Sequence, residues 1–211
     1  MRLEDYWDEL QEIQRKYEVY RACPEEVLRR AAENVHSSII AEGEITTFLP
    51  YERERQGNQL DGKVRPVPVD SEQCCLYNYD EQGRIVLVGV IHQNPKSLAA
   101  QYICEHYEDG TSDCYYGHSM SSLYRMKRVD GHCDTVLAYV PYGGVGFFVE
   151  RYFSENGRLI RTDAVRQDYG EGCFIERFHY QGDRLVRITA EDPEGKAYLL
   201  CYYDVRSSGC R

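Results

Sequence analysis

The sequence predicts an α+β protein that is mainly β: an antiparallel meander of about eleven strands, strongly curled or a partial barrel, with two N-terminal helices. Before about residue 45, apolar residues recur every three or four positions, which is the period of a helix. After Cys74, apolar and aromatic residues alternate with polar ones, which is the period of a strand. A chain of 211 residues can build one compact domain around a good-sized core.

Two helices are expected in residues 1–43, the helical N-terminal segment. The first runs from Leu3 to about Tyr20, because its apolar residues follow steps of three and four along one face. A second helix can begin at Pro24, whose fixed backbone suits a first helical position. Gly43 is expected to end it as a C-terminal cap. The buried stripe of this helix is expected to consist of Val27, Leu28, Ala31, Val35 and Ile39.

Residues 44–72 are expected to form an extended connection, because charged residues, Gly and Pro follow a single short apolar run. Residues 73–211 are then the antiparallel β-hairpin repeat region, in which turn sequences rich in Gly, Asp and Asn separate the strands. Sequential strands joined by short turns pair as neighbours, and a sheet this large curls or splits. The strands are expected at about residues 73–79, 84–91, 100–107, 114–117, 122–129, 135–140, 146–153, 159–165, 173–180, 184–190 and 196–203.

The formal net charge is -10, so a nucleic-acid backbone or an anionic membrane would be repelled and a basic protein would be attracted. The first twenty residues show neither a signal peptide nor a membrane span, and the expected location is the cytoplasm. The nine cysteines are an odd number in a chain without an export signal, so most are expected to be reduced. Cys74 and Cys75 are adjacent in one strand, and we expect one to be buried and the other exposed.

A motif of an aromatic residue, a turn, Gly-Arg and an aliphatic residue recurs in the second region. Its clearest copy comprises Tyr77, Tyr79, Asp80, Gly83, Arg84 and Ile85. A second comprises Phe153, Asn156, Gly157, Arg158 and Leu159, and a looser third comprises His179, Tyr180, Gly182, Arg184 and Leu185. This sequence pattern resembles the YD repeat of RHS proteins, whose repeats build long β-hairpin sheets. By association, the resemblance implies a small immunity protein of a polymorphic toxin system.

The segment YICEHYEDGTSDCYYGHS carries the densest set of polar residues. A metal site there would use Cys104 or His106 with Cys114 and His118, but the spacing contains no C-x-x-C or H-x-x-x-H element. A hairpin with an acidic tip is the favoured interpretation. No nucleophile motif is visible, and the glycines of PYGGVGFF are not followed by the Lys-Ser or Lys-Thr of a phosphate loop. We therefore expect no cofactor, no metal and no catalytic residue.

The leading hypothesis is a non-enzymatic binding protein that neutralises a cognate basic toxin by occluding its active site. Its partner-binding residues are expected in the acidic hairpin, where acids supply hydrogen bonds and tyrosines supply aromatic anchors. Two alternatives are a small hydrolase or ligand-binding barrel with its site inside the curled sheet, and a structural scaffold of hairpin repeats. The candidate partner-binding residues are Glu105, Tyr107, Glu108, Asp109, Asp113, Tyr115 and Tyr116.

Overall fold

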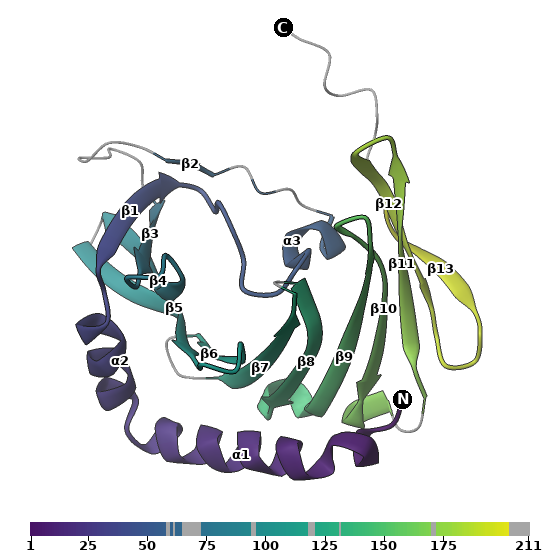
Figure 1. Cartoon of the computed structure of the whole chain (residues 1–211), viewed down its shortest axis with the longest axis horizontal. Helices are drawn as coiled ribbons and strands as arrows, with labels where there is room; N and C mark the ends of the chain where they lie inside the picture. Colours follow the sequence, from purple (N-terminus) through teal and green to yellow (C-terminus); the bar gives the residue numbers. More distant parts are fainter. Residues whose placement is uncertain are drawn as a thin grey trace, which may run out of the picture.

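A computed structural model describes residues 1–57, 60, 62–64, 73–93, 96–117, 121–130, 132–169 and 172–202. In this part of the chain a single 13-stranded sheet runs in the order β13-β12-β11-β10-β9-β8-β7-β6-β5-β4-β3-β1-β2. From β3 (Gln73–Tyr79) to β13 (Ala197–Tyr202), each strand pairs antiparallel with the next one along the chain. The sheet curves into an open C (Figure 1), with β13 and β2 (Lys63–Val64) as its two edges.

Within the described ranges, three helices accompany the sheet: α1 (Trp7–Ala22), α2 (Pro24–Glu33) and the short α3 (Glu52–Arg55). Single turns of 3-10 helix occur at Leu3–Tyr6, Tyr142–Gly144 and Gln167–Tyr169. The remaining strands are β1 (Ser37–Glu42), β4 (Ile85–Gln93), β5 (Lys96–His106), β6 (Ser112–Tyr116), β7 (Ser122–Val129), β8 (His132–Val140), β9 (Gly146–Glu155), β10 (Arg158–Arg166), β11 (Phe174–Gln181) and β12 (Arg184–Glu191).

The mainly β, curled meander is confirmed, and the eleven predicted runs correspond to β3 through β13. The turn between β9 and β10 illustrates why the sequence is informative. Asn156 and Gly157 both adopt positive φ angles, 50° and 75°. A two-residue turn of this kind matches the twist of the strands it joins, and Asn-Gly adopts it at little cost.

The prediction that the second helix runs to Gly43 is wrong. The helix ends at Glu33, and Ser37–Glu42 forms β1, which pairs antiparallel with β3 from Ser37 opposite Tyr79 to Glu42 opposite Cys74. Val35 and Ile39 are four residues apart and so fit a helical stripe, but Ile39, Ile40 and Ala41 also suit a strand. Pairing with β3 supplies backbone partners along the whole segment, and this tertiary interaction overrides the local pattern.

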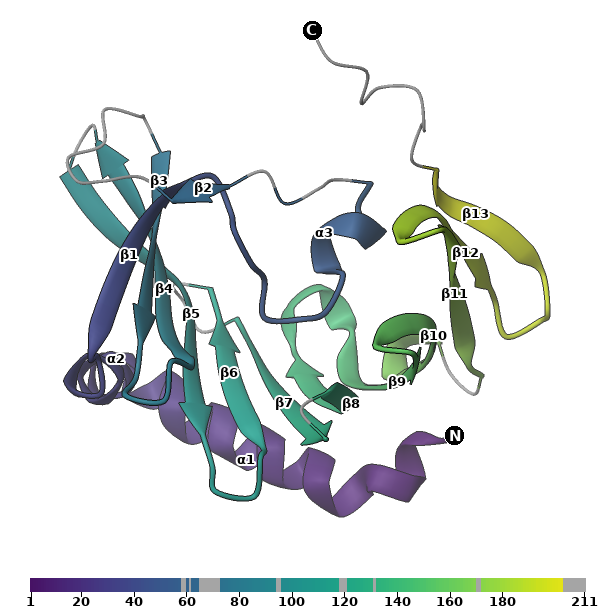
Figure 2. The same cartoon turned by 45° about the horizontal axis from the view of Figure 1, so that its top comes forward.

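The two faces of the sheet are covered by different parts of the chain. Helices α1 and α2 lie on the convex face, and the segment between β1 and β2 enters the concave side (Figures 1 and 2). On the convex side Leu10, Ile13 and Val27 of the helices pack in one cluster with Leu87, Leu123 and Leu137 of the strands. Because both faces bury apolar side chains, the central strands have a core on each side.

Residues 58, 59, 61 and 65–72 of the predicted extended connection, residues 44–72, lie outside the described residues, but its first part packs on the sheet. We call residues 45–55 the inner segment. Its Ile45, Phe48, Leu49 and Tyr51 pack on two clusters of the concave face, and α3 forms its end. The prediction missed this packing because the charged run after Tyr51 reads as a solvated loop.

Candidate functional site

The residues of the predicted acidic hairpin lie in three different environments. Glu108 and Asp109 are exposed in the turn between β5 and β6. Tyr116 lies on the concave side, where its ring stacks on Tyr102 at 6.3 Å between centroids. The other four lie on the convex side, against the helices: Glu105, Tyr107, Asp113 and Tyr115.

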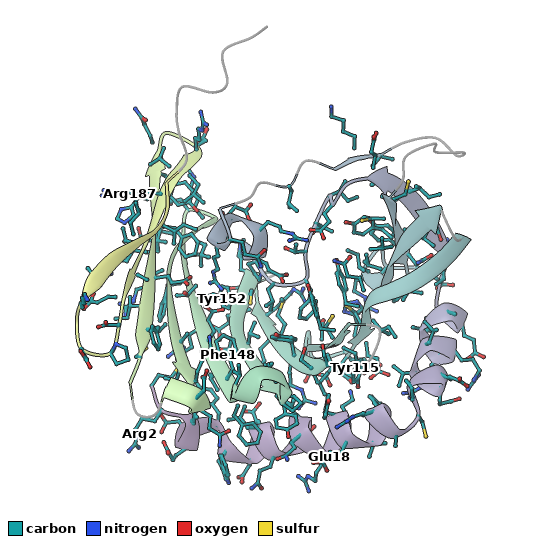
Figure 3. All side chains as sticks on the ribbon, turned by 180° about the vertical axis from the view of Figure 1, so that it is seen from behind. Arg2, Glu18, Tyr115, Phe148, Tyr152 and Arg187 are labelled. Carbon is teal, nitrogen blue, oxygen red and sulfur yellow. The ribbon has the colours of Figure 1, made fainter. Side chains whose placement is uncertain are left out.

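Asp113 and Tyr115 were expected in the hairpin with the acidic tip, and the structure buries both. Tyr115 is 1% exposed, faces α1 (Figure 3) and packs against the ring of Tyr20 at 4.8 Å. Asp113 is 0% exposed because α1 covers this part of β6. Side chains alternate between the faces of a strand, so the odd-numbered residues of the hairpin face the helices.

Asp113 is the centre of a buried ion cluster. Its carboxylate accepts hydrogen bonds from Lys16 Nζ at 2.6 Å and from Arg125 Nε at 2.8 Å. Burial alone would raise the pKa of Asp113, but the hydrogen bonds and charges of Arg125 and Lys16 outweigh it and lower that pKa. Lys16 also lies 3.0 Å from Glu105 and donates to the hydroxyl of Tyr107. This cluster fastens α1 to the sheet.

A second ion cluster lies on the concave face and escaped the sequence analysis. Arg55 of α3 lies 3.0 Å from Glu150 and 2.9 Å from Glu176. Tyr152, which points into the curve of the sheet (Figure 3), donates its hydroxyl to Glu150. Burial raises the pKa of Glu176 although Arg55 opposes the shift. The cluster fastens the inner segment to β9 and β11.

The turns at one end of the sheet carry exposed acids. In a meander every second turn lies at the same end of the sheet. Neighbouring turns at one end are therefore two strand spacings apart, which is about 10 Å. The turns after β3, β5, β7 and β9 share one end. Asp80 in the first of these turns pairs with Arg84, whereas five other acids in or beside these turns make no ion pair with any residue in the described ranges. We call these residues the acidic rim: Glu81, Glu108, Asp109, Asp130 and Glu155.

A hollow of about 500 Å³ opens beside the rim, between the inner segment and the ends of β4 to β7. His106, Ser112 and Arg128 meet in its wall. Nε2 of His106 lies 2.7 Å from the carbonyl oxygen of Ile85, and Nδ1 lies 2.7 Å from Oγ of Ser112. Burial lowers the pKa of His106, so the ring is neutral near pH 7. A carbonyl only accepts, so Nε2 carries the proton and Nδ1 accepts from Ser112.

This histidine and serine do not form a nucleophile with its base. The hydroxyl of Ser112 donates to His106 as a nucleophile does to its base, but Ser112 is 2% exposed, so a substrate cannot reach its oxygen. The Ser112 oxygen also accepts a hydrogen bond of 3.0 Å from Nη1 of Arg128. The three side chains therefore form a fixed chain that positions the guanidinium of Arg128 at the hollow.

The cysteines singled out in the sequence are buried within strands, and the glycines lie in or beside a turn. Cys104 and Cys114 face each other across β5 and β6, with sulfur atoms 3.1 Å apart, and both are buried. The prediction that one of Cys74 and Cys75 is exposed is wrong, because both faces of β3 are covered and they are 1% and 7% exposed. The PYGG sequence joins β8 to β9.

Among the described residues no three His, Cys, Asp or Glu side chains gather as metal ligands would. His118, one of the residues considered for metal binding, lies outside the described residues. A search for helices that could cross a bilayer finds none with the necessary length and apolar character in the described part of the chain.

Comparison with known protein families finds no family that matches the chain. Comparison with curated proteins likewise finds no match.

Proposed function

We propose that this chain is a non-enzymatic binding protein that neutralises a basic partner protein, as an immunity protein neutralises its cognate toxin. The acidic rim meets the cationic surface around the partner's active site and prevents substrate from entering. Blocking a site in this way requires no catalytic residue in the blocking protein.

The observation that carries the proposal is the set of exposed, unpaired acids on four turns at one end of the sheet. Acids engaged in ion pairs elsewhere in the protein, such as Asp113, have lost most of their attraction for a partner. The five acids of the rim keep their attraction for a cationic partner, since no ion pair within the described ranges neutralises them: Glu81, Glu108, Asp109, Asp130 and Glu155. Charges at exposed positions speed diffusional encounter with a partner of opposite sign.

The fold supports this role through the rigidity of the rim. Each acid lies in or beside a tight hairpin turn, and the strands behind the turns are held by apolar packing on both faces. A preorganised surface loses little conformational entropy on binding. The YD-like hairpin repeat and the net charge of -10 agree with the same role.

The experiment is a differential capture from the cells in which the gene occurs. Three baits are compared by quantitative mass spectrometry: the unaltered chain, a rim variant and a control variant with the same net charge as the rim variant. The rim variant carries Glu81→Gln, Glu108→Gln, Asp109→Asn, Asp130→Asn and Glu155→Gln. The control neutralises five exposed acids away from the rim: Glu4→Gln, Asp8→Asn, Glu18→Gln, Glu25→Gln and Glu194→Gln.

We expect a basic protein that the unaltered chain and the control retain and that the rim variant loses. The isolated partner should lose its enzymatic or toxic activity when mixed with the unaltered chain. A partner captured equally by all three baits, or one whose activity is unchanged in the mixture, would contradict the proposal.

A further inference from the structure

The hollow beside the rim has the size of a small-molecule site. Its volume is about 500 Å³, within the range of about 300–1,000 Å³ typical of ligand pockets. One wall is the inner segment, with Thr46, Thr47 and Phe48, and the opposite wall is the concave face of β4 to β7. Side chains from both walls meet there, so the site exists only because the inner segment folds into the curve of the sheet.

The charge of the lining is opposite to that of the protein. Arg84 and Arg128 are the charged side chains that line the hollow within the described residues, and that lining contains no carboxylate. Arg84 is paired with Asp80 at 2.8 Å. Arg128 makes no ion pair with any described residue. In a chain of net charge -10, a hollow with an uncompensated guanidinium selects an anion.

Ser112 and His106 position the guanidinium of Arg128 to bind an anionic group. Nδ1 of the neutral His106 ring accepts a hydrogen bond from the Ser112 hydroxyl, which leaves the lone pairs of the Ser112 oxygen to accept from Nη1 of Arg128. A guanidinium has five N–H donors in a planar fork, and the bond to Ser112 uses one of them. The others can bind a carboxylate or phosphate with two parallel hydrogen bonds. The hydroxyl groups of Thr46, Thr47 and Thr111 border the same space.

Apart from Gly110, the rest of the lining is apolar or aromatic: Phe48, Ile85, Tyr102, Cys104 and Tyr107. We infer that the hollow is a binding site for a small organic anion whose carboxylate or phosphate pairs with Arg128 and whose apolar or aromatic body lies between Phe48 and Tyr102. This inference is independent of the acidic rim, which recruits a cationic protein through other residues.

The test uses ligands that share one ring system and differ in charge. Isothermal titration measures the affinities of 1-naphthyl phosphate, 1-naphthoate, neutral 1-naphthol and cationic 1-naphthylmethylamine. We expect at least one of the two anions to bind ten or more times more tightly than naphthol, and the amine to bind most weakly. The tighter anion identifies whether the site prefers phosphate or carboxylate.

Three variants locate the binding. Arg128→Gln should lower the affinity for the preferred anion about 10- to 100-fold, as expected for a lost charged hydrogen bond. The affinity for naphthol should be nearly unchanged. Arg128→Lys keeps the charge without the planar fork and should give an intermediate affinity. Arg187→Gln changes an exposed arginine on β12, outside the hollow (Figure 3), and should bind like the unaltered chain.

Because Arg128 is exposed, its replacement should change the melting temperature little. Equal affinities for the anions and naphthol would overturn the inference. So would an unchanged affinity in Arg128→Gln, an equal loss in Arg187→Gln, or the absence of binding by either anion at 10 mM.

Discussion

Replacing Asp113 with Asn should destabilise the protein substantially, because it removes the central charge of a buried cluster. Lys16 and Arg125 would each lose a carboxylate partner, at 2.6 Å and 2.8 Å, while their side chains are 17% and 11% exposed. Removing one member of a buried pair costs about 3–5 kcal/mol. Lys16 keeps Glu105 and Arg125 keeps Glu12, so we expect the lower end, about 3 kcal/mol.

For a chain of this size, about 3 kcal/mol corresponds to a decrease in melting temperature of roughly 6–12 °C. Differential scanning calorimetry at pH 7 measures it. The matched control is Asp109→Asn in the same hairpin, which removes an exposed charge and keeps an acceptor for the amide of Thr111. The control should have the same melting temperature as the unaltered protein.

The pH dependence provides a second check on the ion cluster. The folded state lowers the pKa of Asp113, so the ionised carboxylate stabilises the fold. That stabilisation is present above the unfolded-state pKa of about 3.9 and is lost as the pH falls through the lower folded-state pKa. The difference between the unaltered protein and Asp113→Asn should therefore shrink below about pH 4. A melting temperature for Asp113→Asn equal to that of Asp109→Asn at pH 7 would mean that the buried cluster does not stabilise the fold.

Three further predictions concern buried groups. Arg55→Gln leaves buried Glu150 beside half-buried Glu176, whose pKa burial raises, so it should cost about 3 kcal/mol. The cost should be larger at pH 8 than at pH 5.5, because the two acids repel each other when both are ionised; equal costs at both pH values would contradict this. Mass spectrometry after brief alkylation of the native protein should find exposed Cys23 modified well before Cys114, whose thiol pKa burial raises; early modification of Cys114 would argue against a buried thiol. The NMR titration of His106 should have its midpoint below 6.5, and a midpoint above 6.5 would mean that its ring is not the neutral acceptor described.

Most of the fold could be predicted from the sequence because strands and turns are local signals. Alternation placed β3 through β13, and pairs such as Asn156-Gly157 placed the turns. The strand β1 could not be recognised, since Val35 and Ile39 satisfy a helical spacing and the pairing that decides the structure is with β3, about forty residues away in the chain.

The candidate site was harder to predict because it depends on what covers each face. Alternation alone separates Glu105, Asp113 and Tyr115 from Tyr116, but it does not reveal that α1 lies over the first three. Lys16 is 97 residues from Asp113 in the sequence, and no local pattern connects them. The acidic rim could have been predicted from the sequence, because in a meander the turns at Glu81, Asp109 and Asp130 lie at the same end of the sheet.

If the acidic rim recruits a basic partner, the rate of association should depend on the five charges of the rim. Stopped-flow mixing of the captured partner with the unaltered chain, the five-residue rim variant and the five-residue control should be recorded from 20 mM to 500 mM NaCl. We predict association at least about tenfold slower for the rim variant at low salt, with a weak salt dependence, and rates for the control close to those of the unaltered chain. Equal rates for the rim variant and the control at every salt concentration would mean that the rim does not recruit the partner.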